Sequence, residues 1–264
     1  MKRIIQISLF SIAVIGLLTL TGFIVNFNQL SNVAEVRINI YRNGETGFLN
    51  QSEILTVINS IDSLYGRQAG TNKLKINEVE TGNIENVLAN NPYVDMADSY
   101  LTVDGSLLIN IKEKEPIIRI YDNGNKGFYI DNRGDIIPVS RRYAPRVIIA
   151  NGYINEKITN HNTNIADTVY NKSIFRELYV LTQLINQNNL LKAQINQIYV
   201  NSKGEYDLIP ELGDHVVQFG TIENAQNKLC NLGAFYRKTL TSNDWDNYKI
   251  INLTYKDQIV CTKK

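Results

Sequence analysis

Side chains that could carry out catalysis are few and isolated in this sequence. The two histidines, His161 and His215, have no second His, Cys or Glu at the spacing of a metal site, so we expect solvated or edge positions for both. No Gly-x-Ser-x-Gly, Ser-x-x-Lys or Cys-x-x-Cys motif supplies an activated nucleophile, and no glycine-rich phosphate loop occurs. The sequence therefore predicts a protein that is not an enzyme and has no cofactor, metal or small-molecule substrate.

The carboxylates and cysteines leave alternatives open. Asp131 and Asp135 flank a tight turn, and hydrogen bonding within the turn accounts for them. Two acids distant in the sequence could still form a glycosidase pair, so a membrane-anchored hydrolase acting on the cell wall is an alternative function. Cys230 and Cys261 could form a disulfide bond near the C-terminus, or they could be two small buried apolar residues.

Composition favours a folded protein that binds other proteins. The net charge is +1, 44% of the residues are hydrophobic, and no run of five or six like charges occurs, so nucleic-acid binding is not supported. Without catalytic motifs, an exposed edge strand is the feature most suited to recognition. Its unpaired N–H and C=O groups can accept an incoming peptide strand, although an edge can also be capped and pair with nothing.

An apolar run from Ile4 to Val25 opens the chain, and no Asp, Glu, Lys or Arg occurs between Arg3 and Glu35. At about 1.5 Å per residue, a helix of this length crosses the roughly 30 Å hydrocarbon layer of a bilayer. Apolar residues on all its sides disfavour a buried amphipathic helix, and a cleaved signal peptide would be shorter and end at a small-x-small site. The basic residues before the run predict a cytoplasmic N-terminus and an extracytoplasmic remainder.

Residues 30–115 predict a small α+β module. The order is a strand at 35–41, a helix after the capping pair Asn50 and Glu53, a helix at 77–90, and strands at 94–101 and 107–111 joined by Asp104-Gly105. The alternating charges from Lys112 to Glu115 are not expected in a core. Because Pro116 cannot donate a hydrogen bond in mid-sheet, we place the domain boundary between 115 and 116.

Residues 116–264 predict a β-rich domain. We expect successive antiparallel strands at 117–121, 128–130 and 136–139, and another strand at 147–150 that runs into a turn. A helix at 173–187, strands at 193–200, 206–209 and 215–219, a helix at 222–238, and strands at 248–255 and 259–261 follow. The predicted class is thus α+β, with a cytoplasmic tail and a transmembrane helix at 1–29, a β-α-α-β-β module, and a C-terminal domain of an antiparallel sheet and two helices.

Five stretches resemble motifs of one bacterial family, the FtsQ/DivIB cell-division proteins. They are similar to that family's Pro-aromatic-Val-x-x-Ala segment, its strand ending Val-x-Glu-x-x-Pro, its Asp-x-x-Gly hairpin, its strand ending in Gly, and its terminal Val-Asp-Leu-Arg-Tyr strand. In this sequence they are Asn91–Ala97, Leu108–Pro116, Tyr129–Gly134, Val216–Gly220 and Ile250–Tyr255. Asn252 and Thr254 replace the family's usual Asp and Arg, which puts an ion pair of that strand in doubt.

The resemblance implies a POTRA domain at 30–115 and a non-catalytic scaffold of septum assembly. It further implies a single-pass type II protein of the inner membrane at the division site, whose ectodomain lies in the periplasm or outside the cell. The expected partners are FtsB-like and FtsL-like proteins, with the POTRA module serving recruitment. A POTRA protein of polypeptide secretion is an alternative.

Carried onto this sequence, the resemblance predicts partner binding at the C-terminal strands. Leu253 and Tyr255 would share one face of the terminal strand, and Gln258, Ile259 and Val260 would form the following edge, at which a partner adds a strand. Leu253 and Tyr255 could instead face the core and leave only their backbone to a partner. Replacing Val260 with proline is expected to remove a hydrogen-bond donor from this edge.

Overall fold

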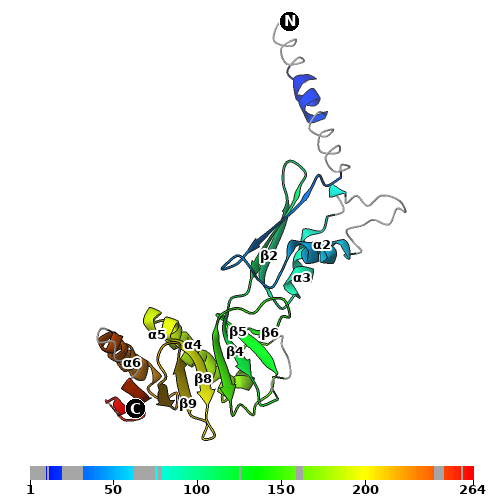
Figure 1. Cartoon of the computed structure of the whole chain (residues 1–264). Helices are drawn as coiled ribbons and strands as arrows, with labels where there is room; N and C mark the ends of the chain where they lie inside the picture. The colour runs from blue at the N-terminus through cyan, green and yellow to red at the C-terminus, as the bar shows by residue number, and fades with distance from the viewer. Residues whose placement is uncertain are drawn as a thin grey trace. The chain divides into compact units, whose positions relative to one another are not determined.

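The computed structural model of the chain describes residues 10, 12–19, 32–61, 75–76, 79–124, 126–158, 163–240, 247–256 and 258–264. The chain forms two compact units, Met1–Glu113 and Lys114–Lys264 (Figure 1). Their boundary lies close to the one predicted before Pro116. Each unit has its own sheet and its own core.

The N-terminal apolar segment is helical where it is described. Residue 10 and residues 12–19 are helical, and their apolar side chains are exposed: Phe10 73%, Ile12 67%, Ile15 61%, Leu17 68% and Leu18 65%. Within the described ranges, no helix is both long and apolar enough to span a bilayer. Ile4 and Val25, the ends of the predicted span, lie outside the described residues.

The first unit has the predicted element order. It consists of β1 (Val36–Tyr41), α2 (Gln51–Asn59), α3 (Thr81–Ala89), β2 (Val94–Leu101) and β3 (Leu107–Glu113). The sheet order is β1-β3-β2, with β1 parallel and β2 antiparallel to β3. The capping prediction is confirmed, since the Asn50 side chain accepts a 2.8 Å hydrogen bond from Glu53 N at the start of α2.

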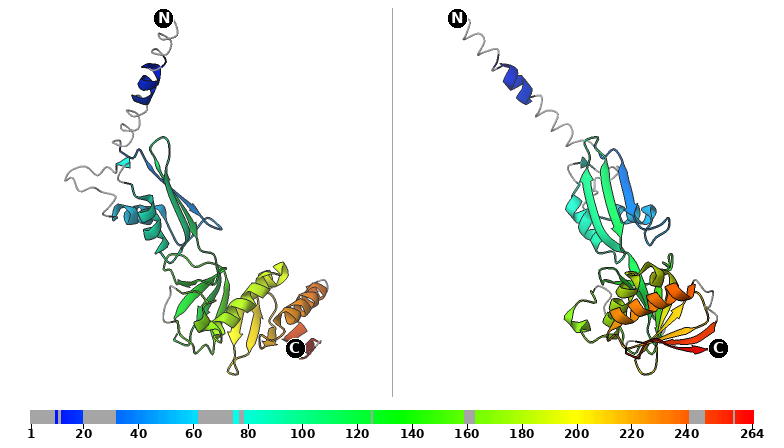
Figure 2. Two further views of the ribbon diagram at one scale, coloured as in Figure 1. Left: turned by 180° about the vertical axis from the view of Figure 1, so that it is seen from behind. Right: turned by 90° about the vertical axis from the view of Figure 1, so that its left-hand side faces the viewer.

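Helices α2 and α3 cover one face of this sheet (Figure 2). Alternation along β3 explains the arrangement, because Leu107, Ile109 and Ile111 are fully buried whereas the residues between them are not. The helices contribute Ile54, Ile58, Ile84 and Leu88 to the same core, each at most 2% exposed.

Glu113, the last residue of β3, contradicts the expectation that the charged run stays outside the core. It is 3% exposed, and its carboxylate accepts hydrogen bonds from Phe48 N (3.1 Å), Leu49 N (3.0 Å) and Arg42 Nη1 (3.2 Å). Three donors compensate for the desolvation of the charge. Gly47 permits the approach, because a Cβ there would lie 2.3 Å from Glu113 Oε2.

The second unit contains a nine-stranded sheet in the order β12-β11-β10-β9-β8-β7-β4-β5-β6. Its strands are β4 (Pro116–Tyr121), β5 (Gly127–Asp131), β6 (Ile136–Pro138), β7 (Ile148–Gly152), β8 (Ile195–Val200), β9 (Tyr206–Pro210), β10 (Val216–Gly220), β11 (Tyr248–Asn252) and β12 (Val260–Lys263). Its helices are α4 (Ile174–Asn186), α5 (Asn189–Gln194), α6 (Ala225–Leu240) and the 3₁₀ helix η2 (Thr168–Tyr170).

Two predictions for this unit are wrong. The sheet is mixed rather than antiparallel, because β7 runs parallel to both β4 and β8, and β10 runs parallel to β11. The chain between β7 and β8 contains α4 and α5, and that between β10 and β11 contains α6, so both returns are crossovers that require parallel pairing. Among the described residues, the helices also number three α-helices rather than two, since α5 was missed.

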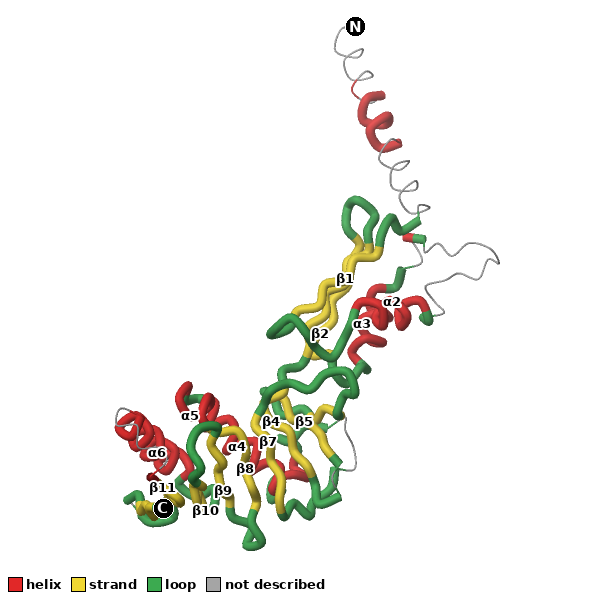
Figure 3. Tube along the Cα trace, viewed as in Figure 1, coloured by secondary structure: helices red, strands yellow, loops and turns green. Residues whose placement is uncertain are grey.

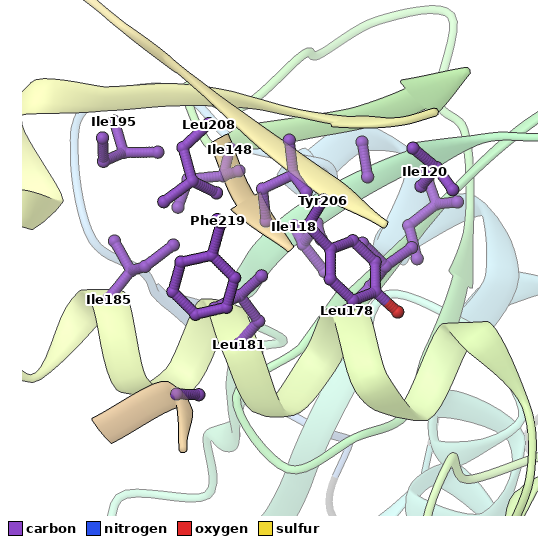
Figure 4. Close-up of a cluster of buried hydrophobic side chains, with 14 of the residues drawn as sticks. Ile118, Ile120, Ile148, Leu178, Leu181, Ile185, Ile195, Tyr206, Leu208 and Phe219 are labelled. Atoms are coloured by element: carbon purple, nitrogen blue, oxygen red, sulfur yellow. The ribbon is translucent and has the colours of Figure 1, made fainter. Parts of the chain in front are cut away.

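The helices pack against one face of this sheet (Figures 2 and 3). Figure 4 shows the contact of α4 with the sheet, where Leu178, Leu181 and Ile185 meet side chains from β4, β7, β8, β9 and β10. All three α4 residues are fully buried. The opposite face carries half-buried side chains such as Asn151, whose Oδ1 accepts a 2.9 Å hydrogen bond from Gln197 Nε2.

Gly152, at the end of β7, is expected to tolerate no side chain. Its φ is +105°, and a Cβ would lie 2.3 Å from Val200 O on the neighbouring strand. We expect Gly152→Ala to lower the free energy of unfolding of the second unit by about 3 kcal/mol, from backbone strain and overpacking together. Gly204→Ala is the matched control, because Gly204 has a φ of +78° but open space around it, so only strain of about 1 kcal/mol applies. Denaturant unfolding of both variants measures the difference, and equal losses would contradict the clash.

Candidate protein-binding site at the C-terminal sheet edge

The nine-stranded sheet ends at β12 on one side and at β6 on the other. Strand β6 has only three residues, including Pro138, which lacks an N–H and makes this edge a poor template for another strand. Strand β12 contains no proline and pairs with β11 antiparallel. In the described part of the chain no strand occupies its other side. The outer edge of β12 is therefore open to a partner strand.

The register shows which main-chain groups of β12 face outward. Lys264 N donates a 3.1 Å hydrogen bond to Asn247 O, and Cys261 is paired with Ile251. Because successive residues of a strand direct their N–H and C=O groups to alternate sides, Val260, Thr262 and Lys264 face β11. Cys261 and Lys263 direct theirs to the open side. The expectation that Val260→Pro removes a hydrogen-bond donor from the open edge is therefore wrong, since Val260 N faces into the sheet.

The structure separates the two residues that we expected on one face. Strand β11 ends at Asn252; Leu253 is 3% exposed and packs in the core, whereas Tyr255 is 51% exposed. Asn252 Oδ1 accepts hydrogen bonds from Thr254 N (2.8 Å) and Thr254 Oγ1 (2.7 Å), which turns the chain out of the strand. The prediction of a shared face is wrong, and the role of both residues in partner binding stays a prediction.

Asn252, which stands where the family usually has Asp, forms an uncharged side-chain hydrogen bond rather than an ion pair. Its Nδ2 donates a 3.0 Å hydrogen bond to Gln218 Oε1 on the neighbouring strand β10. The main chain continues the pairing through Leu253 N, which donates to Gln218 O at 2.9 Å. An amide pair thus holds β11 on β10 where the sequence departs from the family pattern.

Four of the five predicted binding residues, Leu253, Tyr255, Gln258 and Ile259, line one surface groove of about 390 Å³. The fifth, Val260, is 40% exposed and starts β12 next to it. Sequence analysis missed the opposite wall, which α6 and the turn before it provide through Thr221, Glu223, Asn224, Asn227, Lys228 and Asn231. The only signal was the spacing of Asn227 and Asn231, four residues apart and thus on one helix face.

Exposed lysines surround the edge. Lys249, Lys256 and Lys263 are all exposed, and Lys264 Nζ lies 3.0 Å from Asp214 Oδ2. The positive potential of such a group favours a partner segment that carries acidic side chains.

The residues considered for chemistry do not converge on this edge. Asp131 is 1% exposed, and its Oδ1 accepts hydrogen bonds from Arg133 N (2.9 Å) and Asp135 N (2.8 Å), as turn bonding predicts. Burial raises the pKa of Asp131. Asp135 is paired with Lys114 Nζ at 3.0 Å. Within the described ranges, no group of His, Cys, Asp and Glu side chains could hold a metal ion.

Both cysteines are free, so the structure contains no disulfide bond between Cys230 and Cys261. Cys230 is exposed on α6 and Cys261 is partly buried on β12, so neither is a fully buried apolar residue. The two cysteines therefore do not cross-link the C-terminal end of the sheet.

The predictions for the histidines have different outcomes. His161 lies outside the described residues. For His215 the prediction of a solvated or edge position is wrong, because it is 2% exposed, and its Nε2 lies 3.0 Å from Tyr236 Oη on α6. The ring pair also makes an edge contact at 5.7 Å between centroids. His215 therefore holds α6 against the sheet.

The burial of His215 predicts a pH-dependent stability. Burial first, and then Lys264, lower the pKa of His215 in the folded protein, against the opposing charge of Asp214. The unfolded chain binds the proton more readily, so stability falls as the pH drops below about 6.5, by at most about 1.4 kcal/mol per pH unit, until the folded-state pKa is reached. Denaturant unfolding at pH 7.5 and at pH 5.5 measures this loss of stability, because the two values lie on either side of the unfolded-state pKa of about 6.5. We expect His215→Gln to show a smaller one, and an identical loss would contradict the assignment.

Comparison with protein families identifies both halves of the chain. A family model described as FtsQ/DivIB, C-terminal related, matches residues 115–262, and one described as a POTRA-like domain matches residues 32–112. A search of characterised proteins found no match.

Proposed function

The chain belongs to the FtsQ/DivIB family, and from this membership we propose that it is a non-catalytic scaffold of the bacterial division machinery. The observation that carries the proposal is the open edge of β12 at the end of the family-matched unit, beside a groove and among exposed lysines. Such an edge binds a partner by adding a strand, which needs no catalytic group.

We propose that the partners are FtsB-like and FtsL-like single-span proteins. An added strand would pair with the outward main-chain groups of Cys261 and Lys263. Acidic side chains on that strand would complement Lys256 and Lys263, and apolar ones would meet Val260 and the half-buried Ile259. The POTRA-like unit would serve recruitment to the division site.

We further propose that the apolar run anchors the chain as a single-pass type II protein of the inner membrane, with both units outside the cytoplasm. The support is the length of the run and the exposure of apolar side chains on several sides of residues 12–19. Lys2 and Arg3 before the run favour the cytoplasmic N-terminus.

Depletion of the protein in its native cell tests the division role. We expect filaments that lack septa, and their rescue by the full chain expressed from a second copy. Normal division with altered wall composition would contradict the proposal and favour an envelope hydrolase, whereas a secretion defect without filaments would favour a POTRA protein of polypeptide export.

A further inference from the structure

The groove beside α6 is built from two firmly held walls. One is the start of α6, with Asn227 and Asn231 in the groove. The other is the segment 253–256, which the buried side chain of Leu253 anchors. Gly220 lets the second wall approach β10, because a Cβ there would lie 2.9 Å from Thr254 Cγ2, and its φ of +75° also favours glycine.

Four uncharged amides are among the polar side chains of the groove. Asn224, Asn227, Asn231 and Gln258 all line it and are all exposed, and none of their side-chain amides forms a hydrogen bond with another described residue. Each amide offers two donors and one acceptor with two lone pairs. Tyr255, 51% exposed, adds an aromatic ring and a hydroxyl at the same surface.

The charges of the groove cancel. Two carboxylates, Glu205 and Glu223, face two ammonium groups, Lys228 and Lys256. Lys228 is already engaged, since its Nζ donates a 2.9 Å hydrogen bond to Thr221 O and lies 4.9 Å from the centre of the Phe219 ring. A groove without net positive charge is unsuited to a phosphate, and a largely polar lining is unsuited to an apolar cofactor.

We propose that this groove binds a short, uncharged oligosaccharide of N-acetylated sugars. The amides match the donors and acceptors of hydroxyl and acetamido groups, and an aromatic ring packs against the C–H face of a sugar. Its volume of about 390 Å³ lies within the usual range of ligand sites. A peptide strand is less suited to the groove itself, because its walls are a helix and a loop that offer no strand edge.

Titration of the full chain in detergent micelles with a tetramer of N-acetylglucosamine tests the proposal. Ligand-detected NMR is expected to show saturable binding with a Kd on the order of 1 mM, as suits an open polar site. A glucose tetramer of the same linkage, which lacks the acetamido groups, is expected to bind more weakly. Absence of saturable binding, or equal binding of both tetramers, would overturn the proposal.

Two variants locate the binding. We expect Tyr255→Ala to weaken it about five- to tenfold through loss of the ring, and Asn227→Leu, of similar size, to weaken it about fivefold. Gln226→Leu is the control, because Gln226 is the exposed neighbour on α6 that does not line the groove. Equal weakening by Gln226→Leu would overturn the assignment. No division partner takes part in the titration, so its failure leaves the proposed scaffold role untouched.

Discussion

Replacing Glu113 with alanine is expected to lower the free energy of unfolding of the first unit by about 3–5 kcal/mol. The buried carboxylate is the shared acceptor for Phe48 N, Leu49 N and the Arg42 guanidinium. Its removal leaves two main-chain donors and a half-buried cation without that acceptor, and it opens a cavity beside the stacked rings of Phe48 and Tyr93, 4.8 Å apart. The loop before α2 would lose its attachment to the end of β3.

Two optical signals separate this effect from a loss in the second unit. The single tryptophan, Trp245, lies in the sequence range of the second unit, so its fluorescence is expected to report on that part of the chain, whereas circular dichroism follows both units. In denaturant, Glu113→Ala should move part of the dichroism transition to lower concentration and leave the fluorescence transition unchanged. Glu45→Ala, in the same loop but exposed, should change stability by no more than about 0.5 kcal/mol. A shift in the fluorescence transition, or equal effects of the two variants, would show that Glu113 does not act as described.

Local signals made the first unit predictable. Asn50 followed by Glu53 indicated the start of α2. Asp104-Gly105 indicated the turn between β2 and β3, and Pro92 indicated the end of the second helix before β2. Each depends on residues within a few positions of one another. The order of elements follows from them without any knowledge of tertiary contacts.

Glu113 and His215 were misjudged because their environments come from distant parts of the chain. The donors to Glu113 lie 64 to 71 residues earlier, and the partner of His215 lies 21 residues later on α6. Residue type alone favours exposure for both, since burying a polar group is costly without such partners. Only the fold supplies them.

The mixed sheet, by contrast, could have been predicted. The expected helix at 173–187 separates β7 from β8, and the expected helix at 222–238 separates β10 from β11. A strand-helix-strand succession indicates a crossover, and crossovers join parallel strands. The segment that forms the open edge was indicated by the sequence, and partner binding there stays a prediction. Which main-chain groups face outward depends on the pairing of β12 with β11, which no single residue type reveals.

The proline substitution Cys261→Pro is expected to abolish co-purification of the proposed FtsB-like partner while the second unit stays folded. Cys261 N points to the open side of β12, so proline removes a donor that a partner strand needs and no donor within the sheet. An edge strand tolerates proline where its missing N–H would face solvent. Cys261→Ala controls for the loss of the side chain and should retain the partner.

The companion variant Val260→Pro tests the register on which this expectation depends. Val260 N faces Asn252 of β11, so proline at 260 breaks a hydrogen bond inside the sheet. We expect it to lower the free energy of unfolding by about 3 kcal/mol, the usual cost of proline inside a regular element. Cys261→Pro should cost much less, because it removes no hydrogen-bond donor within the sheet. Partner capture from detergent extracts, together with the Trp245 fluorescence transition, distinguishes the two. If Cys261→Pro still captures the partner, the interface does not lie at β12. If Cys261→Pro loses much stability and Val260→Pro does not, then the N–H of Cys261, and not that of Val260, faces β11.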